Sequence, residues 1–274
     1  MRHKGVKVNF SYSTLISFSE RVQDHSFALR ATPRVPIGGR VVSHEIRMVP
    51  GTPLSTGTDS FGNTLTTGHL DLRHDFLAYE SAGCVETQGA LCHWADLRET
   101  SLYAFATQLT TPSDPMMEMA LKLRGSADRG EPMSDNDLIL WSQSLMDVVS
   151  ERMTYTPGVT TIETTAAQAW QMQCGVCQDF AQVAIALARA AGIPARYVCG
   201  LLMGEGATHA WVELKASADM WLAIDPTHHR LVTEEYIKMA HGRDFTDCSM
   251  SRGAFRGGNA RQDTRVTCLV TPVV

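Results

Sequence analysis

The 274-residue sequence contains no long apolar run and no strong excess of charge of one sign. No stretch of about 18 apolar residues occurs, so a membrane-spanning helix is not expected. The basic residues at the N-terminus are followed by mixed polar and apolar residues, which argues against a secretory signal. The formal net charge of −5 comes without a block of like charges, so we expect neither nucleic acid nor a membrane among the partners.

The sequence also lacks the features of a disulfide framework and of a calcium loop. An odd number of widely scattered cysteines, without a signal sequence, indicates reduced thiols and a cytoplasmic location. No D-x-[DN]-x-[DN]-G pattern occurs, so calcium dependence is not implied, and we expect no metal and no cofactor. The seven cysteines are Cys84, Cys92, Cys174, Cys177, Cys199, Cys248 and Cys268.

Two parts of different character are present, and together they predict an α+β fold. Residues 1–90 contain short segments of alternating polarity separated by turn-rich pieces, which predicts an N-terminal β-sandwich-like domain. The turn-rich segment 51–63 is expected to be an exposed connection between strands. Residues 91–274 begin with helical spacing and continue with strand patterns, so we assign them to a second domain.

Within the second part, one helix and three strands matter most. Apolar residues at steps of three and four predict a helix over about 177–191, and Gly192 and Pro194 mark its end. Three strand candidates follow, separated by turn residues, and a last apolar strand closes the chain. An earlier helix is expected after Ser134, which is a plausible N-cap. The strand candidates lie at 195–204, 209–216, 220–226 and 264–274.

The stretch QMQCGVCQDF places Cys177 at the N-terminus of the predicted helix. Unpaired amides and the helix dipole stabilise negative charge there, which favours the thiolate form of a cysteine. His209 begins the strand pattern HAWVEL, and Asp225 ends the pattern WLAID. If these strands are antiparallel neighbours, His209 and Asp225 approach each other, and a Cys–His–Asp set for acyl transfer results.

The C-x-x-C formed by Cys174 and Cys177 has two other readings, a zinc site and a redox pair. A structural zinc site needs a second compact pair of ligands, whereas Cys199 and His209 lie ten residues apart on a strand pattern. A thioredoxin-like pair follows a β-strand, and the preceding TTAAQAWQMQ does not have a strand pattern. We therefore favour Cys177 as a nucleophile and Cys174 as a small, half-buried neighbour.

Four segments resemble the transglutaminase-like (papain-like) superfamily. They are GVCQDFAQVAIALARAAGIPARYVCGLL, THAWVEL, WLAIDPTHHR and HGRDF. The resemblance is strongest to its bacterial cysteine-protease type, in which a β-rich domain precedes the core. The core match runs over about 150–260, and LRATPR and DSFGN extend a weaker match into the N-terminal part. The resemblance implies a papain-like core in which the nucleophile helix packs on an antiparallel sheet.

Carried over residue by residue, the resemblance implies Cys177 as nucleophile, His209 as general base and then acid, and Asp225 as the group that orients His209. Related enzymes often place an oxyanion-supporting side chain six or seven positions before the nucleophile, which here means Trp170 or Gln171. Trp211 lies on the same strand face as His209 by the period of two, so it either shapes the pocket or fills the core.

The function that follows is acyl transfer through a thioester, most simply hydrolysis of a peptide or protein substrate by a cysteine peptidase or amidase. Two alternatives stay open at this point. Transfer to an amine, as in a transglutaminase, passes through the same thioester. A non-catalytic scaffold with this fold is the third reading, although all three triad residues are present.

Overall fold

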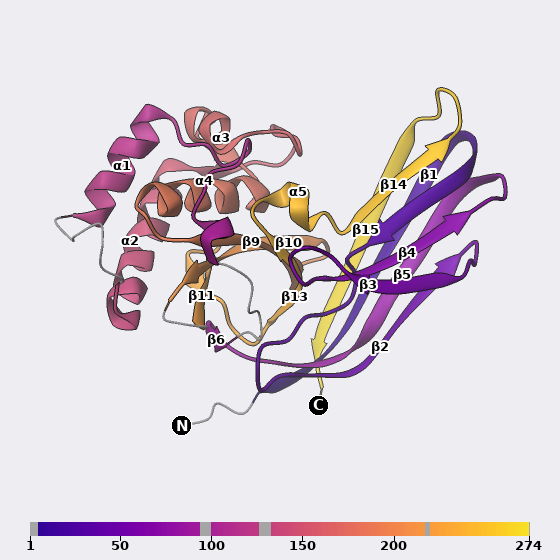
Figure 1. Cartoon of the computed structure of the whole chain (residues 1–274), viewed down its shortest axis with the longest axis horizontal. Helices are drawn as coiled ribbons and strands as arrows, with labels where there is room; N and C mark the ends of the chain where they lie inside the picture. Colours follow the sequence, from indigo (N-terminus) through magenta and orange to yellow (C-terminus); the bar gives the residue numbers. More distant parts are fainter. Residues whose placement is uncertain (1–4, 94–99, 126–132, 217–219, 274) are drawn as a thin grey trace.

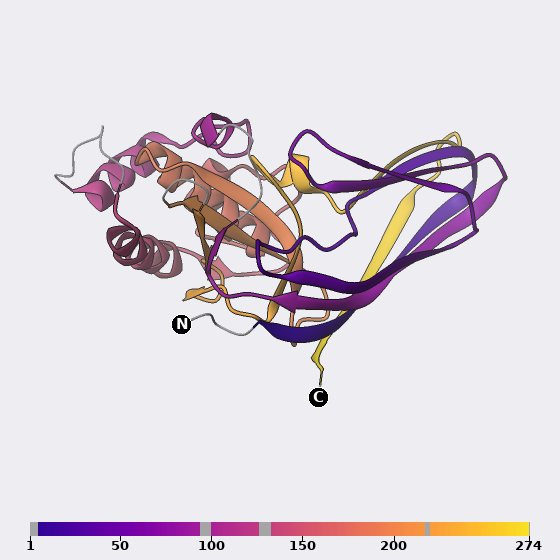
Figure 2. The same cartoon turned by 60° about the horizontal axis from the view of Figure 1, so that its bottom comes forward.

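In the computed structural model the protein has the predicted α+β architecture. The structure describes residues 5–93, 100–125, 133–216 and 220–273. The helices lie at one end of the molecule and the long N-terminal strands at the other, with a six-stranded sheet between them (Figures 1 and 2). None of the helices in the described ranges is both long and apolar enough to cross a membrane.

The N-terminal part is a curled antiparallel assembly built around the long strand β1. Alternate residues of β1, such as Val8, Phe10 and Tyr12, are buried, as a two-residue period requires. The first half of β1 pairs with β5, and after a register shift between Ser17 and Val22 its second half pairs with β4. The first five strands are β1 (Val6–Leu29), β2 (Arg40–Val49), β3 (Leu54–Thr58), β4 (Thr64–Leu70) and β5 (His74–Thr87).

The end of the chain returns to this N-terminal assembly, which corrects the predicted boundary between 1–90 and 91–274. Strands β14 (Ser251–Arg256) and β15 (Gln262–Pro272) both pair with β1, and Val8 lies opposite Pro272 (Figure 1). The segment 264–274 was rightly predicted as a strand but wrongly assigned to the second domain. Its partner lies about 250 residues away in sequence, and residue patterns do not report such pairing.

The central sheet has the order β12-β11-β10-β9-β13, and β6 also pairs with β11. The predicted strands at 195–204, 209–216 and 220–226 correspond to β9, β10 and β11, which are consecutive antiparallel neighbours. The sheet strands are β6 (Leu91–His93), β9 (Ala195–Leu202), β10 (Thr208–Lys215), β11 (Met220–Asp225), β12 (Arg230–Leu231) and β13 (Tyr236–Gly242).

Helix α4 packs on β9 and β10 and is covered in turn by other helices (Figure 1). Every residue of α4 from Asp179 to Arg189 is buried, because the sheet covers one face and the helices α1, α2 and α3 cover the others. The remaining elements are the 3-10 turn η1 (Thr100–Tyr103), α1 (Asp114–Arg124), α2 (Asp135–Arg152), β7 (Thr154–Tyr155), α3 (Ala166–Met172), β8 (Cys174–Gly175), α4 (Cys177–Ala190) and α5 (Phe245–Cys248).

The helix ends agree with the local signals in the sequence. The Ser134 hydroxyl accepts a hydrogen bond from the Asp137 N–H at 3.2 Å, so α2 has the expected N-cap. Helix α4 ends before Gly192, whose φ of +81° is a left-handed conformation that glycine adopts without strain.

The segment 51–63 does more than connect strands, which corrects the expectation of an exposed loop. It contains β3, and its last residue, Asn63, is fully buried against the central sheet. The Asn63 amide donates to the His241 carbonyl at 2.8 Å and accepts from the His241 N–H at 2.9 Å. The Asn63 side chain therefore ties the N-terminal strands to β13 by two hydrogen bonds with the His241 backbone.

Candidate active site

Cys177 is the first residue of α4, as the sequence predicted, and its side chain is half-buried. The helix start is fixed by Asp179, whose carboxylate accepts hydrogen bonds from the Val176 N–H at 2.8 Å and the Thr160 hydroxyl at 2.7 Å. The amide of Cys177 belongs to the first turn, where helix geometry leaves N–H groups without an intrahelical partner. Thiol and free amide thus lie together at one helix end.

His209 and Asp225 meet across the neighbouring strands β10 and β11. The last pair in this ladder is Val212 opposite Ile224, so Asp225 reaches His209 diagonally rather than directly across. His209 Nε2 and Asp225 Oδ2 are 2.7 Å apart, and both side chains are almost fully buried. The bond occupies Nε2 and leaves Nδ1 as the nitrogen that can serve the thiol.

Asp225 also accepts hydrogen bonds from two side chains that the sequence analysis did not assign to the site. Its Oδ2 accepts hydrogen bonds from the Tyr236 hydroxyl at 2.7 Å and His228 Nδ1 at 2.8 Å. Its Oδ1 accepts from the backbone N–H groups of Thr227 and His228, so the turn after β11 is organised by the same carboxylate. His228 was predicted only as a turn residue. The Asp-Pro turn signal places it near Asp225, but the direction of its ring is visible only in three dimensions.

The electrostatics of the group favour an ionised Asp225 and a protonated His209. Burial raises the pKa of Asp225. The hydrogen bond and charge of His209, with the hydrogen bonds from Tyr236 and His228, lower this pKa by more than burial raises it, so the net shift is downward. Burial lowers the pKa of His209, but hydrogen bonds with Asp225, Cys177 and Glu205 outweigh it and raise the pKa well above its usual range. An imidazolium at His209 therefore lies beside Cys177.

Glu205 and Tyr155 are two further residues near the thiol that sequence patterns did not indicate. Glu205 lies in the turn between β9 and β10, and its Oε2 is 3.3 Å from His209 Nδ1. Tyr155 on β7 is exposed and interacts electrostatically with Cys177, Glu205 and His209. Strand β7 runs beside β8, with Tyr155 opposite Gly175, which brings this ring next to the start of α4.

The two residues proposed to support an oxyanion, Trp170 and Gln171, lie at the end of α3 and have different surroundings. Trp170 is buried in the main core, and the Arg152 guanidinium lies 4.9 Å from its ring centre. Gln171 is exposed on the helix surface. Their role in the site stays a prediction, and the burial of Trp170 gives it a packing role as well.

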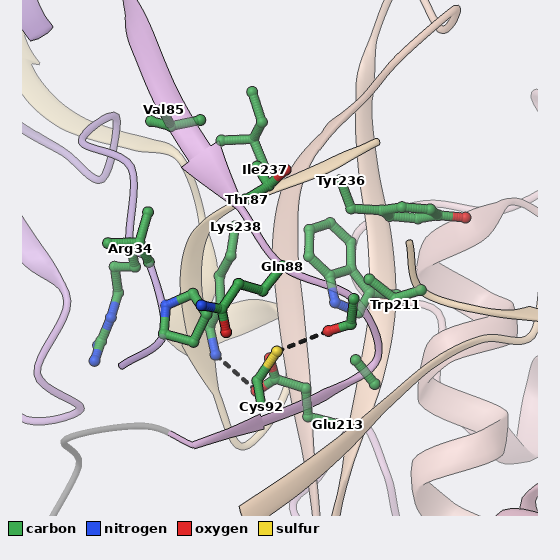
Figure 3. Close-up of a pocket in the computed structure, with 15 residues that line it drawn as sticks. Arg34, Val85, Thr87, Gln88, Cys92, Trp211, Glu213, Tyr236, Ile237 and Lys238 are labelled. Carbon is green, nitrogen blue, oxygen red and sulfur yellow. Dashed lines mark hydrogen bonds and ion pairs between the residues drawn. The ribbon is translucent and has the colours of Figure 1, made fainter. Parts of the chain in front are cut away.

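Trp211 lies on the same strand face as His209, as its spacing predicted, and only 2% of it is exposed. The Trp211 ring stacks with the His209 ring, and the two ring centres are 6.4 Å apart. Figure 3 shows Trp211 lining a pocket that also contains Cys92, Glu213 and Lys238, while the Tyr236 hydroxyl points away from that pocket. Trp211 therefore contacts both the candidate catalytic histidine and this pocket.

The two cysteines of the C-x-x-C do not share an environment. Cys174 is on the short strand β8, and both thiols are free. Cys199 is buried on β9, and burial raises the pKa of its thiol to about 12. Among the described residues, neither group of clustered metal-ligating side chains includes a cysteine. Cys177 combines partial exposure with a neighbouring imidazole, that of His209.

Two protein-family models match this chain. A family model described as "Transglutaminase-like superfamily" matches residues 135–226, which include Cys177, His209 and Asp225. A second model, described as "Bacterial transglutaminase-like N-terminal region", matches residues 8–86. The second match covers the strands β1 to β5 almost completely.

Individual proteins are also similar to this chain. An uncharacterised protein of Mycobacterium tuberculosis is 32% identical over 249 residues, which cover 81% of this chain and 79% of that protein. A protein-glutamine gamma-glutamyltransferase of Pseudomonas aeruginosa is 30% identical over 105 residues, covering 31% of this chain and 16% of the enzyme. The crystal structure of "a Putative Cysteine Protease from Cytophaga hutchinsonii" superposes with a TM-score of 0.76 at 21% identity, covering 98% of this chain and 94% of the other.

Proposed function

The chain belongs to the transglutaminase-like superfamily, and from this we propose that it catalyses thiol-dependent acyl transfer on peptide or amide substrates. The observation that carries the proposal is the 2.7 Å bond between His209 Nε2 and Asp225 Oδ2, beside a half-buried cysteine at a helix N-terminus. A thiol, an imidazole and a carboxylate in this order form the triad arrangement of cysteine acyl-transfer enzymes.

In the proposed first step, the Cys177 thiolate attacks the carbonyl carbon of an amide. A carbon–sulfur bond forms, and the carbonyl π electrons move to the oxygen. The tetrahedral species then collapses, the carbon–nitrogen bond breaks, and His209 Nδ1 gives its proton to the leaving amine. A thioester on Cys177 and a neutral imidazole remain, with the imidazole held by Asp225 through Nε2.

In the second step, His209 Nδ1 accepts a proton from water as the oxygen attacks the thioester. The carbon–sulfur bond breaks, a carboxylic acid leaves, and the thiolate–imidazolium pair is restored. The 33% exposure of the Glu205 side chain and the 38% exposure of His228 support access of water to this side of His209. Solvent access supports hydrolysis, as in a cysteine peptidase or amidase.

The oxyanion of the tetrahedral species needs hydrogen-bond donors. We propose the backbone N–H of Cys177 as one donor, since it is free of intrahelical bonding and points along the helix dipole. Trp170 and Gln171 are the side-chain candidates for a second donor. Gln171 is exposed and can turn toward a bound substrate, whereas Trp170 is buried.

Transfer of the acyl group to an amine is the second candidate function. The similarity to the protein-glutamine gamma-glutamyltransferase, over 105 residues, favours it. The chemistry differs only in the acceptor, because a primary amine takes the place of water at the thioester. A non-catalytic scaffold is the third possibility and requires no reactive thiol.

One product analysis distinguishes hydrolysis, transfer to an amine and a non-catalytic scaffold. The protein is incubated with a peptide library containing glutamine, with and without an added primary alkylamine, and products are read by mass spectrometry. We expect cleaved or deamidated peptides with wild-type protein and none with Cys177→Ala, while Cys174→Ala retains activity. Amine-labelled glutamine as the main product would favour transfer, and no product dependent on Cys177 would refute the acyl-transfer proposal.

A further inference from the structure

Three metal-ligating side chains surround one point on the solvent side of the proposed triad. Glu205, His209 and His228 each direct one ligand atom there, and these atoms lie within 4.8 Å of one another. His209 Nδ1 is 3.3 Å from one Glu205 oxygen, and His228 Nε2 is 3.2 Å from the other. Glutamate and histidine from two turns and a strand start thus converge on one location.

The spacing of these atoms fits a tetrahedral ion. Zinc binds imidazole nitrogen and carboxylate oxygen at about 2.0–2.2 Å, so neighbouring ligand atoms lie roughly 3.3 Å apart. The separation of His209 Nδ1 from Glu205 Oε2 and that of His228 Nε2 from Glu205 Oε1 are both close to this value, and one ligand atom from each residue lies within 4.8 Å of the other two. His209 is almost fully buried, but Glu205 and His228 are partly exposed, so an ion can enter from solvent.

The outer hydrogen bonds fix which nitrogen of each ring faces the ion. His209 binds Asp225 Oδ2 through Nε2, and His228 binds the same oxygen through Nδ1. An ionised carboxylate only accepts hydrogen bonds, so these two nitrogens carry the protons. When an ion displaces any proton on the outer nitrogens, His209 Nδ1 and His228 Nε2 present lone pairs to it. Metal-binding histidines commonly donate their other N–H to a carboxylate in this way.

The Glu205 carboxylate cannot donate to these two nitrogens, because a carboxylate only accepts hydrogen bonds. Glu205 faces both nitrogens, so the three groups need protons or a cation between them. We propose that Glu205, His209 and His228 form a binding site for a divalent zinc ion. Zinc suits imidazole and carboxylate ligands, whereas magnesium and calcium prefer oxygen ligands alone.

The ion would inhibit the proposed acyl transfer, and this consequence alone rests on the proposed function. Zinc on His209 Nδ1 occupies the nitrogen that exchanges protons with Cys177 and the substrate. The binding itself depends only on the three ligands. The site therefore makes the protein a zinc-inhibited thiol enzyme, in which a chelator restores activity.

The test measures zinc binding directly in the Cys177→Ala protein, so its outcome is independent of any activity. Zinc chloride is titrated by calorimetry under reducing conditions, with magnesium chloride as the comparison ion. We expect one zinc ion per chain and no magnesium binding. We expect His228→Ala and Glu205→Gln to weaken zinc binding by about tenfold or more.

His229→Ala is the matched control, because His229 is the adjacent histidine and binds Asp147 instead, at 2.7 Å. It should leave zinc affinity unchanged. Thermal unfolding of each variant establishes that it is folded, and Glu205→Gln alters only a partly exposed side chain. Absence of zinc binding, or equal affinity in His228→Ala, Glu205→Gln and His229→Ala, would overturn the proposal. Zinc binding with no product activity would instead contradict only the proposed function.

Discussion

At the scale of single residues, Asp225 Oδ2 is the atom on which the candidate site converges. It accepts from His209, His228 and Tyr236 while no solvent reaches it. A carboxylate with several donors holds its negative charge and its direction firmly. Tyr236 is hydrogen-bonded to Asp225, so we regard it as a positioning residue that acts through that carboxylate.

Tyr236→Phe removes one donor from Asp225 and keeps the ring. We expect the rate of Cys177-dependent turnover to fall by about threefold to tenfold with little change in KM, because the loss acts on triad orientation. Steady-state kinetics of wild-type and variant protein measure this. Tyr79→Phe is the control, since it removes a comparable buried hydroxyl contact, to Tyr12 at 3.0 Å, in the N-terminal strands. Equal effects of both variants would show that Tyr236 has only a structural role.

A second prediction at this scale concerns His25, which is buried in the N-terminal assembly. Burial and the neighbouring His74, whose Nε2 is 3.1 Å from His25 Nδ1, lower the pKa of His25 from 6.5 to about 4. Between these values the unfolded chain binds a proton that the folded chain does not. Stability should therefore be full above pH about 6.5 and fall as the pH drops toward 4, by up to about 3 kcal/mol.

Denaturant unfolding between pH 4 and 7 measures this loss. His25→Phe keeps an aromatic ring without a titrating group, so it should flatten the slope in this pH range. His229→Phe changes an exposed histidine that is not among the groups that lower the pKa of His25, and it should leave the slope as in wild type. The interpretation would be wrong if the slope were the same in His25→Phe as in wild type.

The three candidate triad residues could be singled out from the sequence, whereas their neighbours in the structure could not. Cys177, His209 and Asp225 occupy a helix start, a strand start and a strand end, and each position leaves a local signal. Glu205, His228 and Tyr155 enter the site through the direction of side chains in turns and on a two-residue strand. Those directions depend on how the elements pack, which no local pattern records.

At the scale of elements, Gly200 on β9 lies opposite His209 on β10. A Cβ there would lie 2.1 Å from the Ile237 carbonyl and 2.5 Å from the Trp211 ring. Gly200→Ala should therefore displace Trp211 and the strand that carries His209. We expect a loss of stability of roughly 1–3 kcal/mol.

Thermal and denaturant unfolding of Gly200→Ala, with Gly57→Ala as control, measures this effect. A Cβ at Gly57 on β3 meets no atom within 4 Å, so that variant should be close to wild type. We also expect slower alkylation of Cys177 in Gly200→Ala, because His209 moves with its strand. Wild-type stability of Gly200→Ala would contradict the packing described for Trp211.

Elements were predictable where their cause is local. The helix over 177–191 and the strands β9, β10 and β11 follow from periodicity and stop signals. The long β1 combines two pairings with a register shift, and β14 and β15 join it from the far end of the chain. Pairing over such separations is decided by the assembled sheet, so the domain boundary at residue 90 missed it.

At the scale of the whole molecule, the N-terminal strands and the central sheet are joined by buried polar contacts. The Asn63 side chain binds both backbone groups of His241, and the Arg34 backbone N–H donates to the Lys238 carbonyl at 2.8 Å in an isolated β-bridge. The β15 strand also reaches the turn that carries Glu205, since the Cys268 N–H donates to the Gly206 carbonyl at 2.9 Å. The N-terminal assembly thus supports a turn that borders the candidate site.

Asn63→Ala tests this connection. It leaves the His241 N–H and carbonyl without their partner in a buried place, so we expect a loss of about 2–4 kcal/mol. Urea unfolding followed by tryptophan fluorescence measures the change. Asn9→Ala, on an exposed face of β1, is the control and should be nearly neutral. An Asn63→Ala protein as stable as Asn9→Ala would show that the junction contributes little.

The central claim is that Cys177, His209 and Asp225 form a thiol acyl-transfer triad. The most direct measurement treats the protein with a p-nitrophenyl acyl ester, follows the burst of nitrophenolate, and locates the acyl group by peptide mass spectrometry. The account predicts one acyl group per chain, on Cys177, with a slower burst in Asp225→Asn and an unchanged burst in Cys174→Ala. Acylation at other cysteines, or an undiminished burst in Cys177→Ala, would contradict it.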